Sequence, residues 1–211
     1  MKLYLLKSGL FFIALLSFSF SSFAAEMFSE NIQYKRVAPA QTGAKKDKIE
    51  VTEFFLYSCK PCFQLDTKLE KWISNNKEKV NFNRVPAVVS PSWVPLAKAY
   101  YVAKKLNILD KTHDALFKSI HEDKKVYLNE YSLSEFYEKH GVKPDVFIRE
   151  FNSQDVVDKV SDARVLTVKY AFRGVPAVVM NDEFKTAPFY VRDQEKMLDV
   201  MDFLLVKVTE K

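Results

Sequence analysis

Apolar and polar positions alternate in a way that predicts a strand, a helix and a second strand in the early part of the chain. The stretch KIEVTEFFLY, residues 48–57, is rich in Val, Phe and Tyr and predicts a buried strand. From Pro61 onward, apolar residues recur at steps of three and four, which predicts a helix with one buried face. The residues on that face are Cys62, Leu65, Leu69, Trp72 and Ile73. Residues 80–89, VNFNRVPAVV, predict the next strand and complete a β–α–β unit.

The middle of the chain is predicted to be entirely helical. Ser132 and Glu135 have the spacing of a capping box at a helix start, and Gly141 is a typical helix stop. No strand pattern interrupts this stretch. Helices are predicted from Pro95, over about 111–122, over 133–140, from Pro144 and over about 154–170.

Strand patterns return late in the chain. VPAVVMN, residues 175–181, predicts a short apolar strand, and Asn181 with Asp182 predicts a turn into a hairpin partner that begins at Phe184. A final helix carries its apolar face between residues 197 and 205. We expect the early and late strands to form one sheet, which makes this an α/β protein with a helical insertion.

The first residues resemble a secretory signal peptide. Lys2 and Lys7 precede an apolar run over residues 10–20, and small residues follow at once, ending in Ala24. We expect residues 1–24 to be removed and the mature chain to be exported. A membrane anchor is the alternative, but the apolar run is shorter than the ~20 residues of a spanning helix.

Composition excludes some classes of function. The net charge of +5 is modest, and basic residues alternate with acidic ones instead of forming a basic block with interleaved aromatics. We therefore expect no nucleic-acid partner. A hydrophobic share of 48% is typical of a globular protein.

The chain has two cysteines, and both lie in the segment SCKPC as Cys59 and Cys62. A metal site needs further ligands, and His113, His121 and His140 show no ligand spacing and are expected on helix surfaces. We expect no metal and no cofactor. An inert structural bridge is the second alternative, but so short a loop removes little entropy from the unfolded chain.

A redox dithiol is the favoured interpretation of this pair. Cys59 follows a predicted strand at the start of a predicted helix, where unpaired N–H groups stabilise a thiolate. Lys60 adds a positive charge beside it, and Pro61 fits the first helical turn. Cys62 lies on the apolar stripe, so we expect an accessible attacking sulfur at Cys59 and a buried partner at Cys62.

The segments EFFLYSCKPCFQL and FRGVPAVVMN resemble the DsbA family of periplasmic thiol:disulfide oxidoreductases. The resemblance implies a thioredoxin fold with an inserted all-helical domain. The thioredoxin-like parts would be residues 25–88 and 169–211, and the insertion residues 89–168. It also implies a cis Pro176 that faces the disulfide, with Val175 before it, where extended clients bind. An ordinary trans proline at a strand edge is the alternative.

Two further residues enter through the same resemblance. It implies that Glu53 lies beneath the disulfide as a proton relay, with Arg84 as its basic partner on the neighbouring strand. An exposed position at the strand end is the alternative for Glu53. The chain departs from the family's best-known members between the cysteines, where Lys60-Pro61 replaces Pro-His, so its oxidising strength stays open.

The function that the resemblance implies is an exported oxidase that donates the Cys59–Cys62 disulfide to reduced or unfolded exported proteins. The reaction would pass through a mixed disulfide at Cys59. The expected location is the periplasm, the expected state is a monomer, and a DsbB-like quinone-linked membrane oxidase would reoxidise the protein. A disulfide reductase or isomerase, and a non-enzymatic chaperone-like binding protein on the same fold, are the alternatives.

Overall fold

The computed structural model describes residues 27–38, 47–171 and 173–209, so the predicted signal peptide over residues 1–24 lies outside it. A five-stranded mixed sheet has the order β1-β5-β4-β2-β3. Its strands are β1 (Lys35–Arg36), β2 (Ile49–Phe55), β3 (Val80–Pro86), β4 (Ala177–Met180) and β5 (Phe184–Thr186). β2 pairs in parallel with β3 and antiparallel with β4. The early and late strands therefore share one sheet, as predicted, while the two-residue β1 was not predicted.

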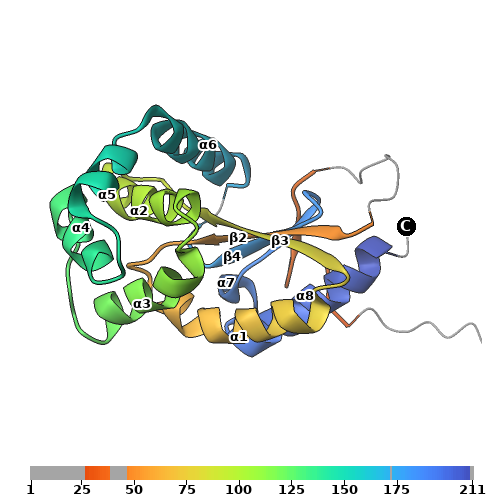
Figure 1. The fold of residues 1–211 in the computed structure, drawn as a ribbon. Helices are drawn as coiled ribbons and strands as arrows, with labels where there is room; N and C mark the ends of the chain where they lie inside the picture. Colours follow the sequence, from red (N-terminus) through yellow and green to blue (C-terminus); the bar gives the residue numbers. More distant parts are fainter. Residues whose placement is uncertain (1–26, 39–46, 172, 210–211) are drawn as a thin grey trace, which may run out of the picture.

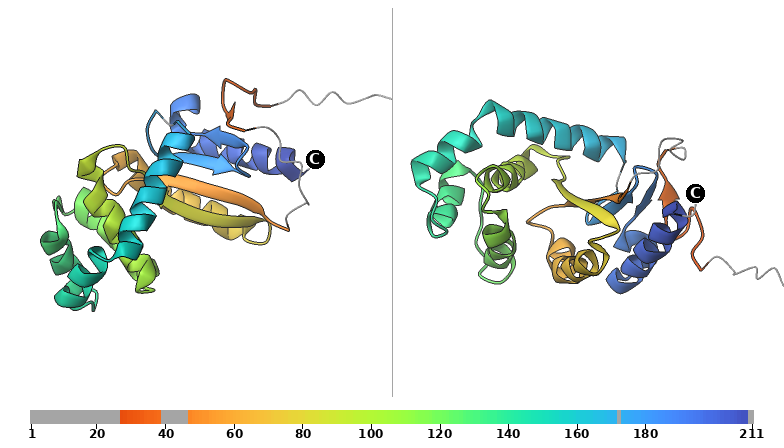
Figure 2. Two further views of the ribbon diagram at one scale, coloured as in Figure 1. Left: turned by 90° about the horizontal axis from the view of Figure 1, so that it is seen from above. Right: turned by 45° about the vertical axis from the view of Figure 1, so that its right-hand side comes forward.

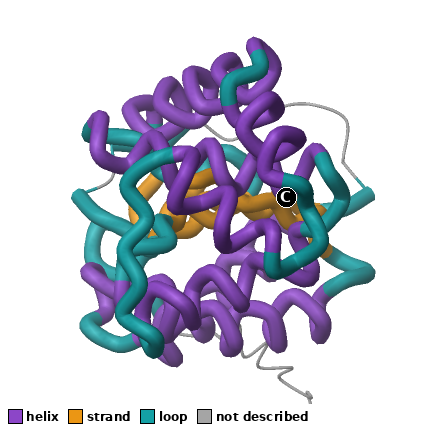
Figure 3. The backbone as a smooth tube through the Cα atoms, turned by 60° about the vertical axis from the view of Figure 1, so that its left-hand side comes forward, coloured by secondary structure: helices purple, strands orange, loops and turns teal. Residues whose placement is uncertain are grey.

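Helices cover both faces of this sheet (Figure 1, Figure 3). They are α1 (Lys60–Asn76), the 3-10 helix η1 (Pro91–Trp93), α2 (Val94–Lys105), α3 (Leu109–His121), α4 (Glu130–Glu138), α5 (Pro144–Phe151), α6 (Gln154–Lys169), α7 (Pro188–Val191) and α8 (Gln194–Thr209). α1 and α8 lie side by side on one face, and α6 lies on the opposite face (Figure 2). The helices from η1 to α6 all fall between β3 and β4 in the chain, which confirms the predicted helical stretch.

The alternation of side chains along the strands assigns each to one face. Ile49 and Val51 of β2 belong to a core with α1 and α8, together with Met180 of β4. Phe54 and Val179 point the other way, into a second core shared with the inserted helices. We call the second cluster the insertion core.

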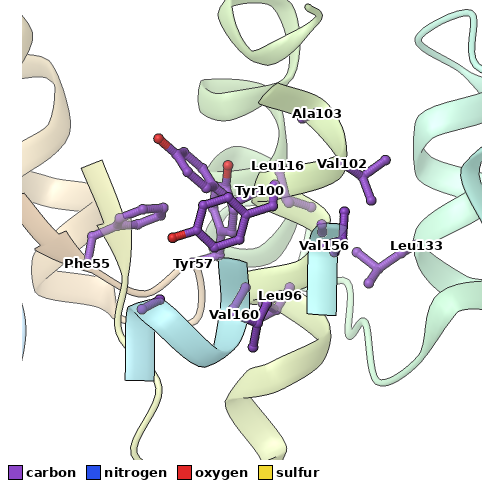
Figure 4. Close-up of a cluster of buried hydrophobic side chains, with 14 of the residues drawn as sticks. Phe55, Tyr57, Leu96, Tyr100, Val102, Ala103, Leu116, Leu133, Val156 and Val160 are labelled. Atoms are coloured by element: carbon purple, nitrogen blue, oxygen red, sulfur yellow. The ribbon is translucent and has the colours of Figure 1, made fainter. Parts of the chain in front are cut away.

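The insertion core joins the helical stretch to the sheet. Figure 4 shows Phe55 and Tyr57, at the end of β2 and just beyond it, among side chains of the inserted helices, including Tyr100 and Leu116. Both aromatic rings are almost completely buried. The insertion is therefore packed against the segment that leads directly into Cys59. In the part of the chain that the structure describes, no helix has the length and apolar character needed to cross a bilayer.

The predicted cap of α4 is wrong. The helix begins one turn earlier than expected, and Asn129 is its N-cap, with Oδ1 accepting from the Ser132 backbone N–H at 3.0 Å. The Ser132 hydroxyl accepts from the Asn129 N–H in return, so Ser132 is the third helical residue and Glu135 is exposed. Gly141 follows the helix with φ +87°, a left-handed conformation that glycine adopts without strain.

Truncation of Leu116 to alanine is expected to destabilise the protein by about 2–5 kcal/mol, because this fully buried side chain would leave a cavity in the insertion core. Val165→Ala on α6, where the side chain is 63% exposed, is the matched control and is expected to change stability by less than about 0.5 kcal/mol. Urea unfolding of both variants measures the difference. Equal effects of the two substitutions would contradict the position of the insertion core.

Candidate active site

The two cysteines form a disulfide at the start of α1. Cys59 is the N-cap residue with extended backbone angles of φ −87° and ψ 110°, and its N–H donates to the Leu56 carbonyl at 3.0 Å. This turn reverses the chain between the end of β2 and the helix. Lys60 and Pro61 occupy the first helical turn and are exposed, where the missing N–H of proline leaves no hydrogen bond unmade.

The two sulfurs lie in different surroundings. Cys62 is completely buried in the insertion core, while Cys59 is half-buried. The Cys62 backbone N–H donates to Cys59 Sγ at 3.2 Å. Negative charge on Cys59 would therefore meet a donor and the positive end of a 17-residue helix. The predicted asymmetry of accessible Cys59 and buried Cys62 is confirmed.

A proline loop faces the disulfide. The Val175–Pro176 peptide bond is cis, and the Val175 carbonyl oxygen lies 3.3 Å from Cys59 Sγ. β4 begins directly after this loop, and Ala177 is paired with Phe54 near the end of β2. Because β4 runs antiparallel to β2, the start of β4 lies beside the point where the chain turns toward Cys59. The cis geometry and the position facing the disulfide agree with the expectation from the resemblance.

Glu53 and Arg84 form an ion pair between neighbouring strands. They are direct partners in the parallel register of β2 and β3, and Arg84 Nε donates to Glu53 Oε2 at 2.9 Å. Glu53 is only 2% exposed, so the alternative of an exposed strand end is wrong. Its side chain lies on the same face of β2 as Val51, the face that α1 covers.

One guanidinium serves three carboxylates at this position. Besides Glu53, the Arg84 Nη2 group donates to Asp66 Oδ1 at 3.3 Å and to Glu70 Oε1 at 2.6 Å, both on α1. Burial raises the pKa of Glu53 to about 7, although the charge of Arg84 acts in the opposite direction. Burial also raises the pKa of Asp66, but hydrogen bonding from His113 and the charges of His113 and Arg84 outweigh it and leave that pKa lowered. Glu53 therefore binds and releases a proton near neutral pH beneath α1.

The histidines do not lie where the sequence pattern placed them. His113 is 7% exposed, so its expected surface position is wrong. Its Nδ1 is 2.8 Å from the Tyr57 hydroxyl, and its Nε2 is 3.2 Å from Asp66 Oδ1. The missed signal is helical spacing, since His113 precedes Leu116 and Phe117 by three and four residues on the buried face of α3.

His121 and His140 are both half-buried. His121 Nε2 lies 2.8 Å from the Tyr57 carbonyl oxygen, and His140 Nδ1 lies 2.9 Å from the Phe136 carbonyl oxygen. Within residues 27–38, 47–171 and 173–209, no group of three or more His, Cys, Asp or Glu side chains is arranged to hold a metal ion. The described side chains around the cysteines thus offer thiol, carboxylate and imidazole chemistry.

A disulfide at a helix start, with one accessible and one buried sulfur and a proline loop across from it on a mixed sheet, defines a thioredoxin-fold dithiol–disulfide oxidoreductase. A family model described as a DSBA-like thioredoxin domain matches residues 76–201. The chain belongs to the DsbA family, as the resemblance of its two motifs predicted.

Named relatives extend the similarity over most of the chain. The chain is 32% identical to a thiol:disulfide interchange protein DsbA of Burkholderia cepacia over 82% of both chains. It is 30% identical to the protein of the same name from Azotobacter vinelandii, over 82% of this chain and 81% of that protein. These relatives confirm the prediction of a thiol:disulfide oxidoreductase.

Solved structures of DsbA proteins have the same fold. The oxidoreductase DsbA of Xylella fastidiosa superposes with a TM-score of 0.77 at 32% identity, covering 85% of this chain and 96% of that one. DsbA of Pseudomonas aeruginosa gives a TM-score of 0.79 at 23% identity, covering 87% and 95%. The predicted thioredoxin fold with an inserted helical domain is confirmed.

Replacement of Glu53 by glutamine is expected to change how stability depends on pH. The folded protein holds the Glu53 proton up to about pH 7, whereas the unfolded chain releases it near 4.5. This carboxyl group therefore lowers the free energy of unfolding as pH rises through that window, because the unfolded chain releases the proton at lower pH than the folded protein does. The Glu53→Gln variant lacks this contribution, and urea unfolding at several pH values measures it.

Glu135→Gln, on the exposed side of α4, is the matched control for charge removal. Its stability profile is expected to run parallel to that of the unmodified protein across the same pH window. A Glu53→Gln profile that also ran parallel would show that Glu53 titrates in the folded state as it does in the unfolded chain.

Proposed function

We propose that this oxidoreductase works as an oxidase that donates the Cys59–Cys62 disulfide to reduced client proteins. The observation that carries the proposal is the Cys62 N–H that points at Cys59 Sγ, 3.2 Å away, at the N-terminus of α1. A donor and a helix dipole at this sulfur stabilise its thiolate, which exists only in the reduced enzyme. A stabilised reduced form makes the corresponding disulfide a strong oxidant.

The reaction proceeds in two exchanges. A client thiolate attacks Cys59 Sγ, the bond to Cys62 breaks, and the Cys62 thiolate leaves. A second client thiolate then attacks the client sulfur of the mixed disulfide and expels the Cys59 thiolate. The client gains a disulfide, and the enzyme takes up the two electrons as a dithiol.

Glu53 is proposed to supply the proton that the departing Cys62 thiolate takes up. Two observations support this role: the side chain lies on the face of the sheet that α1 covers, and its pKa of about 7 keeps a proton available near neutrality. Arg84 orients the carboxyl group through the 2.9 Å hydrogen bond from Nε.

Val175 and Pro176 are proposed to bind the client. An extended client segment would add to the backbone of this loop, beside Cys59, by strand addition. The contact between the Val175 carbonyl oxygen and Cys59 Sγ supports the assignment, since a segment held there lies next to the attacked sulfur. Lys60 and Pro61 form the exposed surface beside it, where the charge of Lys60 favours the approach of a thiolate.

We further propose that residues 1–24 direct export, and that the enzyme works as a periplasmic monomer on reduced exported proteins, with no nucleic-acid partner. A DsbB-like quinone-linked membrane oxidase would accept the two electrons and restore the disulfide. The assignment to the DsbA family and the signal-peptide pattern support this placement. The proposed domain limits are 25–88 and 169–211 for the thioredoxin-like parts and 89–168 for the insertion.

One observation favours a reductase instead. The residues between the cysteines are Lys60 and Pro61, so the Cys59 thiolate lacks a hydrogen bond from a histidine at this place. One hydrogen bond to a charged sulfur contributes about 1.5–3 kcal/mol, and about 1.4 kcal/mol corresponds to ~30 mV for this couple. The oxidising power therefore depends on the helix start and on the groups around it.

Equilibration with glutathione is expected to give a potential well above the ~−270 mV of thioredoxin. In the reduced protein, the thiolate absorbance is expected to titrate well below the ~8.5 of a free cysteine, because the helix start stabilises the anion. A potential near that of thioredoxin would identify a reductase.

Two serine variants test the order of attack. Cys62→Ser is expected to accumulate a mixed disulfide with a client that carries a disulfide, because the Cys59 thiolate displaces one client thiolate and no second enzyme thiol is left to resolve the bond. Cys59→Ser, the matched control, is expected to form none, because Cys62 is completely buried. Non-reducing gel electrophoresis with a disulfide-bonded model client measures both, and a mixed disulfide formed by Cys59→Ser would identify a different nucleophile.

A further inference from the structure

The inserted helix α3 contacts both flanks of the cysteine segment through two histidines. On the side before Cys59, His113 Nδ1 meets the Tyr57 hydroxyl at 2.8 Å, and His121 Nε2 meets the Tyr57 carbonyl oxygen at 2.8 Å. Tyr57 is thus held by its side chain and by its backbone, two residues before the attacked sulfur. Figure 4 shows the Tyr57 ring among side chains of the inserted helices.

The same histidines contact α1 on the side after Cys62. The His121 ring stacks on Phe63, with centroids 5.0 Å apart and planes 10° from parallel. His113 Nε2 lies 3.2 Å from Asp66 Oδ1, one helical turn further along. Phe63 directly follows Cys62, so α3 bridges the segment 57–66 at both ends.

The surroundings of His113 exclude water and fix its ring. Phe117 packs edge-on against it at 5.1 Å, and Phe55 does so at 5.2 Å. The charged and titratable groups that face it come from several elements: Tyr57 after β2, Asp66 on α1 and Tyr100 on α2. Through Asp66 it joins the group around Arg84, which contains Glu53 and Glu70.

We propose that His113 and His121 are positioning residues for disulfide exchange, which hold the turn before α1 so that Cys59 Sγ stays over the Cys62 N–H. The inserted helical domain thereby sets the oxidising power of the cysteine pair. The proposal rests on the proposed function in one respect: it takes stabilisation of the Cys59 thiolate at the helix start as the source of that power.

The contacts of the two histidines are expected to matter more in the reduced enzyme. In the oxidised enzyme, the covalent bond itself keeps Cys59 close to Cys62. Once that bond opens, only non-covalent contacts hold the turn, and α3 contributes two polar contacts at Tyr57, a buried one from His113 and a part-buried one from His121. Loss of a histidine therefore destabilises the reduced form more than the oxidised form and weakens the oxidant.

The test compares His113→Leu and His121→Leu with His140→Leu. The control, His140, belongs to the same insertion and is half-buried, as His121 is. Its ring contacts the Phe136 carbonyl oxygen of α4 and not the cysteine segment. For His113→Leu and His121→Leu, the glutathione equilibrium is expected to move about tenfold toward the protein disulfide, equivalent to ~30 mV. The thiolate absorbance is expected to titrate at higher pH in both variants and to stay unchanged in His140→Leu.

A second readout separates positioning from simple support of the fold. Urea unfolding of oxidised and reduced protein is expected to show a larger loss of stability in the reduced form of His113→Leu and His121→Leu. His113→Gln keeps an amide that can meet either partner and is expected to recover part of the shift. If His113→Leu fails to fold, the test is made with His113→Gln and His121→Leu.

Equal loss of stability in both redox forms, with the glutathione equilibrium within twofold of the unmodified protein, would overturn the proposal. A shift in His140→Leu as large as in the other two variants would overturn it as well. The redox potential of the unmodified protein tests the proposed function separately. A thioredoxin-like potential that still moves with the histidines removes the oxidase assignment and leaves the positioning role standing.

Discussion

The contact between the Cys62 N–H and Cys59 Sγ is the interaction on which the chemistry of this protein depends. It exists because β2 ends in a turn that places Cys59 at the N-cap of α1 and Cys62 one turn inside the helix. The sheet fixes the start of this turn, and burial of Cys62 fixes its end. Backbone geometry stabilises a sulfur at this place as an anion, and the side chains around the turn adjust how strongly it does so.

Beneath that turn, the protein keeps an excess of carboxylates around one guanidinium. Arg84 is shared by the buried Glu53 and Asp66 and by the exposed Glu70, so three carboxylates meet one guanidinium. The two buried carboxyl groups have pKa values shifted in opposite directions. Asp66 receives a second donor from His113 and has a lowered pKa, while Glu53, completely buried, has a raised one. Two carboxyl groups linked to one arginine thus hold their protons at different pH values, which is how environment separates acid and base roles.

Local patterns in the sequence predicted the parts of this arrangement that depend on neighbours along the chain. The place of Pro61 in the first turn of a helix, the turn at Asn181 and Asp182 and the buried position of Cys62 all follow from periodicity and turn chemistry. The partner of Tyr57 did not, because His113 is 56 residues away and a histidine on a helix satisfies either a surface or a core position. The cap of α4 was missed because two residues with capping side chains, Asn129 and Ser132, compete for one helix start.

The insertion core has a consequence for the modularity of the molecule. Phe55 and Tyr57 are buried against the inserted helices, and Val88 donates its N–H to the Thr167 hydroxyl of α6. Excision of residues 89–168 would therefore expose aromatic side chains at the edge of the sheet that leads to Cys59. An exposed apolar patch of this kind promotes aggregation. A single-domain version of this enzyme would need polar residues in place of these exposed aromatic ones. The insertion is therefore a structural part of the catalytic centre and cannot be removed without such changes.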